Sequence, residues 1–164
     1  MIASESSNCS IEENHKMKFL GTGSALPKKV VSNDDLAQVM DTSDEWIRSR
    51  TGIGMRHIAV EETTTSMAVE AAEEALADAK ISGCEIDLII AGTISPDYIF
   101  PSLACEVQAA IGAKSATAFD LSAGCSGFLF ALANSKVCSK LLEILSAALN
   151  ALPGRSRDRV TPKS

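Results

Sequence analysis

Cys125 stands where a predicted strand gives way to a predicted helix, a favourable place for a reactive thiol. The strand-like run 116–121 precedes it, and residues from Gly127 onward favour a helix. The unpaired N–H groups and positive dipole end of that helix would favour the thiolate, and the small neighbouring residues would let a thioester carbonyl approach the backbone. A cysteine packed in the core is the alternative, because free cysteine is among the most buried residue types. The spacing alone leaves both interpretations open.

Trp46 and Arg50 form a second candidate site, because they are four residues apart and would share one face of a helix predicted over 43–50. An indole and a guanidinium in this arrangement could hold a flat aromatic base between them, and the arginine would also attract phosphate. A surface tryptophan packed against the stem of an arginine is the alternative. Taken by itself, the pair favours that structural interpretation.

The elements that would position these residues alternate between strands and helices. A continuously apolar run at 88–94 is typical of a strand covered on both faces, and alanines at helical spacing in 65–80 indicate a helix packed closely on a sheet. Gly21 and Gly23 are interpreted as turn residues. The pattern predicts an α/β domain with helices layered around a mostly parallel sheet. Strands are expected over 17–20, 55–60, 88–94 and 116–121, and helices from 32 to about 40, over 43–50, 65–80 and 102–111, and from Gly127 onward.

Composition and charge argue against several classes of protein. The net charge of −6 at pH 7 and the pI near 4.9 argue against a nucleic-acid-binding surface. The five cysteines never form a C-x-x-C pair, which argues against a zinc site or a disulfide framework and favours a cytoplasmic location. No apolar run reaches the ~20 residues of a membrane-spanning helix. Residues 1–16 are polar and acidic and are expected to form a disordered leader, with Met17 as an alternative start.

Residues 41–53, DTSDEWIRSRTGI, resemble the signature of the β-ketoacyl-[acyl-carrier-protein] synthases III, the initiating condensing enzymes of fatty-acid synthesis. Four further segments match that family in the same order, and the resemblance extends over about residues 17–133. It implies the N-terminal half of a thiolase-like fold, with helices around a mostly parallel mixed sheet. The four segments are Leu20–Pro27, Arg56–Ala59, Phe100–Ser102 and the run 118–130 around Cys125.

The resemblance also implies a reaction. In the family, the cysteine that Cys125 matches takes an acyl group from acyl-CoA. Malonyl-acyl carrier protein then loses carbon dioxide, and its carbanion attacks the acyl thioester to give 3-oxoacyl-acyl carrier protein. No cofactor or metal is implied, since the coenzyme A thioester is a substrate.

Other site residues follow from the same resemblance. Trp46 and Arg50 match positions that contact coenzyme A, and Phe100 matches one that crosses a homodimer interface to line the partner's acyl pocket. Phe100 could equally serve as a hydrophobic cap of the helix that follows Pro101. His57 matches no catalytic position and is expected to be structural. The remaining cysteines, Cys9, Cys84, Cys105 and Cys138, are interpreted as packing or surface residues.

The sequence departs from the family in its length and in its final segment. The family's enzymes are about twice as long, and their second half supplies a histidine and an asparagine that complete the active site. Here both histidines, His15 and His57, precede Cys125. Preorganised donors of this kind are each typically worth ~10²–10³ in rate, so almost no condensation is expected from this chain alone. Residues 134–164 are expected to form a divergent helix and a basic tail outside the family's pattern.

Two other functions stay open at this point. A non-catalytic fragment, or a subunit that docks on a missing half, would lack condensing activity. A related condensing enzyme of the polyketide or hydroxymethylglutaryl type would differ in acyl-chain specificity, although the 41–53 signature weighs against it.

Overall fold

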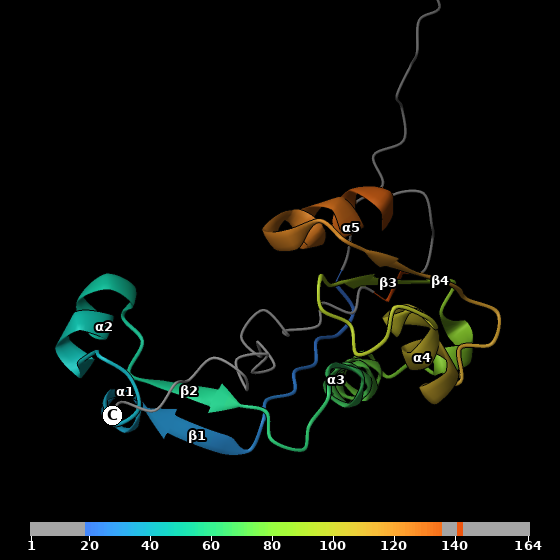
Figure 1. Cartoon of the computed structure of the whole chain (residues 1–164). Helices are drawn as coiled ribbons and strands as arrows, with labels where there is room; N and C mark the ends of the chain where they lie inside the picture. Colours follow the sequence, from blue (N-terminus) through green and yellow to red (C-terminus); the bar gives the residue numbers. More distant parts are fainter. Residues whose placement is uncertain (1–18, 136–140, 143–164) are drawn as a thin grey trace, which may run out of the picture.

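The computed structural model of the chain describes residues 19–135 and 141–142. The expected leader at 1–16, the alternative start at Met17 and most of the segment 134–164 therefore lie outside the described residues. Figure 1 shows a small sheet with helices on both faces and, beside it, a hairpin with two short helices. In chain order the elements are β1 Lys29–Ser32, α1 Asn33–Ala37, α2 Asp44–Thr51, β2 Met55–Ile58, α3 Thr64–Ala79, β3 Leu88–Gly92, α4 Leu103–Ala110, β4 Thr117–Leu121, α5 Gly127–Ser135 and β5 Leu141–Leu142.

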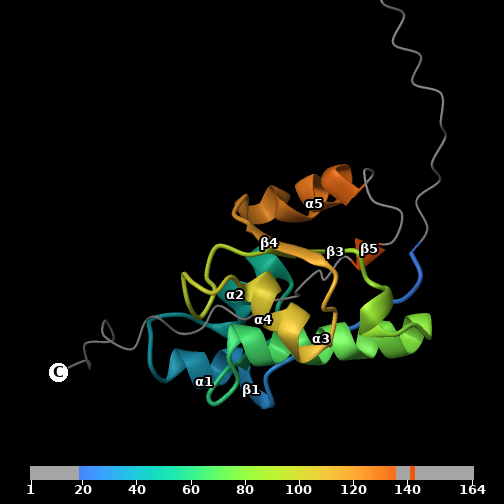
Figure 2. The same ribbon diagram turned by 90° about the vertical axis from the view of Figure 1, so that its right-hand side faces the viewer.

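The sheet has the strand order β4-β3-β5, and both strand pairs are parallel. Residues 88–91 of β3 are all buried, which confirms the prediction of a strand covered on both faces. Figures 1 and 2 show the cause: α3 and α4 lie on one side of the sheet and α5 on the other. Parallel strands need crossover connections of this kind, and the helices of the crossovers cover the sheet.

The main core lies between β3 and the two helices beneath it. Ala72 of α3, Ile89 of β3 and Leu103 and Val107 of α4 are each at most 1% exposed. The alanine spacing therefore identified the buried face of α3 correctly. Small side chains on that face let the helix lie close to its neighbours. Alanine side chains also have no rotamer freedom to lose when they are packed.

Gly21 and Gly23 lie in a segment that runs alongside α3 in the opposite direction, so the prediction that they form a turn is wrong. A Cβ atom added at Gly23 would overlap the carbonyl oxygen of Ala71, and one added at Gly21 would also overlap the α3 backbone. Two backbone N–H groups of the same segment donate to the carboxylates of Glu74 and Asp78 on α3. These glycines are thus required by close approach of two backbones.

The hairpin pairs β1 with β2 in antiparallel register, with Lys29 opposite Ile58. The two short helices beside it both begin at a serine that caps them. The Ser32 side chain accepts a hydrogen bond from a backbone N–H of α1, and the Ser43 side chain does the same for α2. Gly52, with φ of 73°, ends α2 in the left-handed conformation that glycine tolerates best. This confirms the sequence-based expectation for α2.

Two other segments differ from the sequence-based expectations. Phe19 and Leu20, part of the expected strand 17–20, belong to no strand, and the first half of that strand lies outside the described residues. Leu141 and Leu142, expected within a helix, instead form β5 beside β3. A leucine-rich run fits both a helix and a buried strand, and only its pairing with β3 decides between them. No helix within 19–135 or 141–142 is long and apolar enough to cross a bilayer.

Glu62 joins the hairpin to the segment that precedes it. Its carboxylate accepts hydrogen bonds from the backbone N–H groups of Lys28 (3.0 Å), Val60 (3.1 Å) and Glu61 (3.3 Å). These bonds, above all the one from Lys28, lower the pKa of Glu62 from 4.5 to about 2. The carboxylate therefore stabilises the folded state only in its ionised form.

The low pKa of Glu62 predicts acid sensitivity. Its contribution to the free energy of unfolding should be complete above pH 4.5 and should be lost as the pH falls from 4.5 towards 2, because the unfolded chain takes up the proton first. Glu62→Gln should therefore lower stability at pH 7 and converge with the unaltered chain near pH 2. Urea unfolding at a series of pH values checks this, with Glu61→Gln as the matched control. A constant difference across the series would contradict the prediction.

Candidate functional site

Cys125 lies in a single 3-10 turn, Gly124–Ser126, between the end of β4 and the start of α5. Its side chain is exposed and its thiol is free, so the core-packing alternative does not hold. Gly124 has a φ of 53°, and this left-handed residue turns the chain out of the strand. The sulfur is thus exposed, and it lies just before the first turn of a helix, the position that the sequence predicts for it.

The helix that follows Cys125 is held against the sheet through small residues. Ala131 of α5 is 2% exposed and packs with Leu88 and Ile90 of β3. At the start of α5, the backbones of Gly127 and Gly92 approach closely enough that a Cβ at Gly127 would lie 3.6 Å from the Gly92 Cα. The first turn of α5 therefore lies directly over the carboxyl end of β3, the end of a parallel sheet where ligands usually bind.

Asp120 is a site-positioning residue that the sequence analysis missed. From β4 its carboxylate accepts hydrogen bonds from the backbone N–H groups of Leu103 (2.9 Å) and Ala104 (2.8 Å), the first two residues of α4. An acidic group suits the N-terminal end of a helix, where backbone N–H groups lack partners. The strand that leads to Cys125 is thereby fixed to the helix that follows Phe100. The only signal in the sequence is that Asp120 is the one charged residue of this strand.

Phe100 lies in the loop between β3 and α4 and is 89% exposed. This exposure does not fit the interpretation of Phe100 as a hydrophobic cap, which would pack its ring on α4. Three other large apolar side chains of the loop are also exposed: Ile94 (69%), Tyr98 (63%) and Ile99 (99%). We call these four residues the apolar loop. Patches of this kind usually mark a surface that contacts another molecule.

Trp46 and Arg50 lie on one face of α2, as predicted. The Arg50 guanidinium carbon stands 4.5 Å from the centroid of the Trp46 ring, and Nη1 of Arg50 donates to the Trp46 carbonyl oxygen at 3.4 Å. A base held between the two groups would need about 7 Å, twice the contact distance of stacked atoms. The expected sandwich is therefore not open here. A base must stack on the other face of the indole or displace the guanidinium. Trp46 as a whole is 54% exposed.

The two candidate sites are well separated. Figure 1 shows α2 at the left, beyond the hairpin, and α5 above the sheet, so the structure does not bring Trp46 and Arg50 next to Cys125. Only an extended ligand could contact both. Nδ1 of His57 is 2.5 Å from the carbonyl oxygen of Pro27, a structural contact far from the thiol in sequence. Within the described residues no group of three or more histidine, cysteine or acidic side chains could hold a metal ion.

Comparison with known proteins identifies relatives of the chain. No protein-family model matches it. The β-ketoacyl-[acyl-carrier-protein] synthase III of Xylella fastidiosa is 52% identical over 136 residues, which cover 79% of this chain and 42% of the relative. The namesake from Streptococcus suis is 60% identical over 111 residues, 68% of this chain and 34% of the relative. The chain thus spans less than half the length of these curated relatives.

Solved structures give the same result for the fold. The 3-oxoacyl-[acyl-carrier-protein] synthase III of Aquifex aeolicus matches with a TM-score of 0.70 and 55% identity, over 72% of this chain and 38% of that one. The priming β-ketosynthase of the R1128 polyketide pathway matches with a TM-score of 0.69 and 39% identity, over 72% of this chain and 36% of that one. The chain is a homologue of the β-ketoacyl-[acyl-carrier-protein] synthases III and has the thiolase-like fold of one part of these enzymes.

Proposed function

We propose, from this homology and from the position of Cys125, that the chain carries the acyl-accepting part of a β-ketoacyl-[acyl-carrier-protein] synthase III. The thiolate of Cys125 attacks the carbonyl carbon of an acyl-CoA, and the carbon–sulfur bond to coenzyme A then breaks. Coenzyme A leaves as a thiolate and takes up the proton that Cys125 lost. The acyl group is left as a thioester on Cys125.

The observation that carries this proposal is the exposed thiol at the start of α5. An acyl-CoA can reach it from solvent, and the small residues on either side leave the backbone accessible to the thioester oxygen. Backbone N–H groups at a helix start can donate to the negative charge that develops on that oxygen. Thioester exchange needs no bound cofactor.

Coenzyme A is the proposed partner of the Trp46–Arg50 face of α2, and a second copy of the chain is the proposed partner of the apolar loop. The exposed indole of Trp46 offers a stacking face for the base, and the guanidinium of Arg50 a positive charge for phosphate. The apolar loop with Phe100 is proposed to contact the other subunit of a homodimer near its acyl pocket. We further propose a cytoplasmic enzyme of fatty-acid synthesis, in which malonyl-acyl carrier protein takes the acyl group from Cys125 with loss of carbon dioxide.

The 164-residue chain is expected to carry out acyl transfer without condensation. The only histidine among residues 19–135 and 141–142 is His57, which lies on β2 of the hairpin. The relatives contain more than twice the length that the chain spans. Groups that stabilise the carbanion derived from malonyl-acyl carrier protein are each typically worth ~10²–10³ in rate. A chain without them should keep the first half-reaction and lose the second.

Acetylation of the chain tests the proposal directly. Incubation with acetyl-CoA should place one acetyl group on Cys125, located by mass spectrometry of peptides, and should leave the exposed Cys84 unmodified. Adding malonyl-acyl carrier protein should then produce almost no 3-oxoacyl product. No acetylation of folded chain, or equal acetylation of Cys84 and Cys125, would contradict the proposal.

A non-catalytic docking subunit is the second candidate function, and the apolar loop is the observation that favours it. Such a subunit would associate with a partner through Ile99 and Phe100 without taking an acetyl group. The acetylation measurement separates the two functions. A polyketide-type condensing enzyme would also be acetylated, but its preference among acyl-CoA chain lengths would differ.

A further inference from the structure

Helix α2, which carries Trp46 and Arg50, has little apolar packing of its own. It is eight residues long, and Ile47 is its only buried residue. Helices shorter than about 12–15 residues are marginal in water unless other contacts hold them. The position of the indole and the guanidinium must therefore depend on polar contacts.

These polar contacts converge on Asn33, the first residue of α1, which is 1% exposed. Its side-chain Nδ2 donates to Oδ1 of Asp44 at 2.8 Å and to the carbonyl oxygen of Ile53 at 2.7 Å. Asp44 is the first residue of α2, and Ile53 follows the last residue of that helix by two positions. A single buried amide thus binds the chain at both ends of α2.

The remaining polar atoms of Asn33 fix the amide to the hairpin. Its Oδ1 accepts a hydrogen bond from Nη2 of Arg56 on β2, and its backbone N–H donates to the carbonyl oxygen of Gly54 at 3.2 Å. Both side-chain donors and the acceptor are used, as a buried amide requires. The orientation of the amide is therefore determined, and with it the position of α2 on the hairpin.

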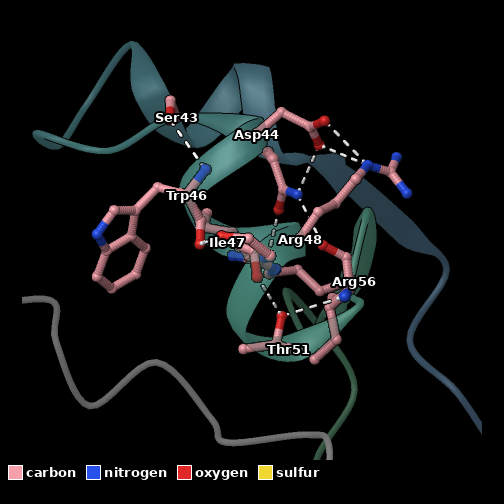
Figure 3. A network of polar contacts seen from close by, with 10 residues as sticks. Ser43, Asp44, Trp46, Ile47, Arg48, Thr51 and Arg56 are labelled. Carbon is pink, nitrogen blue, oxygen red and sulfur yellow. Dashed lines mark hydrogen bonds and ion pairs between the residues drawn. The ribbon is translucent and has the colours of Figure 1, made fainter.

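Asp44 extends the network along α2. Nε of Arg48 lies 3.0 Å and 2.9 Å from the two oxygens of this carboxylate. The hydrogen bonds from Asn33 and then Arg48 hold the pKa of Asp44 below its usual value of 3.8. Figure 3 shows Asp44, Arg48 and Arg56 on one side of the helix and the Trp46 indole pointing away on the other. The network thus leaves the ligand-facing side of α2 free.

We propose that Asn33 is a positioning residue for the coenzyme A contact of α2, since it joins both ends of that helix to the hairpin and contacts no ligand itself. This inference rests on the proposed function of Trp46 and Arg50. It also gives a role to Asp44 and Arg48, which belong to the 41–53 signature but lie on the side of α2 away from Trp46: both are part of the network that holds the helix.

The test uses coenzyme A as the probe and the emission of Trp46, the only tryptophan of the chain, as the readout. Asn33→Ala and Asn33→Asp should each cause an increase of about tenfold in the half-saturating concentration of coenzyme A. The reason is that Asp44 and the carbonyl oxygen of Ile53 lose the hydrogen bonds that the amide donates to them. Aspartate has nearly the shape of asparagine, so a role of Asn33 in filling space would be restored by Asn33→Asp, whereas a role as donor would not.

Further measurements separate positioning from general loss of structure. Acetylation of Cys125 at saturating acetyl-CoA should proceed at an unchanged rate in both variants, and the exposed neighbour variant Asp34→Ala should bind coenzyme A like the unaltered chain. If the Asn33 variants do not fold, Asp44→Ala, which removes a partly exposed acceptor, should give the same weakening. An unchanged half-saturating concentration in Asn33→Asp or in Asp44→Ala would overturn the inference.

The two proposals fail in different ways. Lack of Cys125 acetylation in the unaltered chain would contradict the proposed function, whatever the Trp46 titration shows. Normal acetylation with the same coenzyme A affinity in the Asn33 variants and the unaltered chain would contradict only the positioning role. No change of Trp46 emission on adding coenzyme A to the unaltered chain would overturn the positioning role together with the ligand contact.

Discussion

Cys125→Ala is expected to abolish the transfer of an acetyl group from acetyl-CoA to the chain. The variant removes the only atom that forms the thioester, and alanine has no nucleophile to replace it. Because the Cys125 side chain is exposed, its loss should leave the free energy of unfolding within about 0.5 kcal/mol of the original. Radiolabelled acetyl-CoA, followed by precipitation of the protein, measures the transfer.

Cys84→Ala is the matched control for this experiment, since Cys84 is another exposed, free cysteine. It does not lie at the end of a parallel strand, and its sulfur is 3.2 Å from Oγ of Ser82. This control should be acetylated as fast as the unaltered chain. If Cys125→Ala keeps full acetylation, or if Cys84→Ala loses it, another residue takes the acyl group and the assignment of Cys125 is wrong.

Gly23→Ala is expected to have the largest effect on stability. A methyl group at this position would overlap the carbonyl oxygen of Ala71 and lie 2.5 Å from the backbone nitrogen of Ala75, and neither atom can move without deforming α3. Overpacking that displaces backbone costs about 1–3 kcal/mol, and the overlap with two backbone atoms here points to the upper end, about 3 kcal/mol. The segment should lift off the helix, and the hydrogen bond from the Ser24 N–H to Glu74 should be lost with it. Urea or thermal unfolding monitored by circular dichroism measures the loss.

Gly52→Ala is the control that separates steric overlap from backbone conformation. Gly52 has a φ of 73°, but nothing lies within 4 Å of a Cβ placed there. An alanine in the left-handed region costs about 1–2 kcal/mol, so Gly52→Ala should destabilise the chain less than Gly23→Ala does. A larger effect at Gly52 would mean that the close approach at Gly23 does not determine stability.

The sequence predicted those parts of the fold that depend on local chemistry. The starts of α1 to α4 were predicted to within two residues, because each of these helices begins at a serine or threonine cap, such as Ser43 for α2 and Ser102 for α4. The buried strand β3 and the buried face of α3 followed from apolar periodicity. Local hydrogen bonds and burial on one face leave a pattern in adjacent residues, which is why they could be recognised.

Contacts between distant segments could not be predicted in the same way. Gly23 has the spacing of a turn residue, and only the position of Ala71, 48 residues later, shows that it lets two backbones run close together. Asn33 follows a capping serine, so the sequence gives it the character of an ordinary helix-start residue, although it is the centre of the network under α2. Asp120 likewise acts on α4, 16 to 17 residues earlier in the chain.

The candidate site shows the same division. The position of the thiol at the end of β4 followed from the strand and helix patterns on either side. The close stacking of Arg50 on Trp46 did not, because two side chains at helical spacing can stand apart or in contact. The four-residue spacing determines which face they share, and the rotamers of both side chains determine whether a base can enter.

The strand order β4-β3-β5 leaves β4 at a border of the sheet in the described residues, with β3 on one side only. The outward backbone groups of such a strand accept any extended polypeptide as an added neighbour. The strand β4 leads directly into the turn Gly124–Ser126 that carries Cys125. Self-association of the protein through this edge strand would therefore shield the sulfur from reagents. Thiol labelling of this protein should therefore be carried out over a series of protein concentrations. Labelling that increases on dilution indicates self-association, whereas labelling that stays low at every concentration indicates an unreactive thiol.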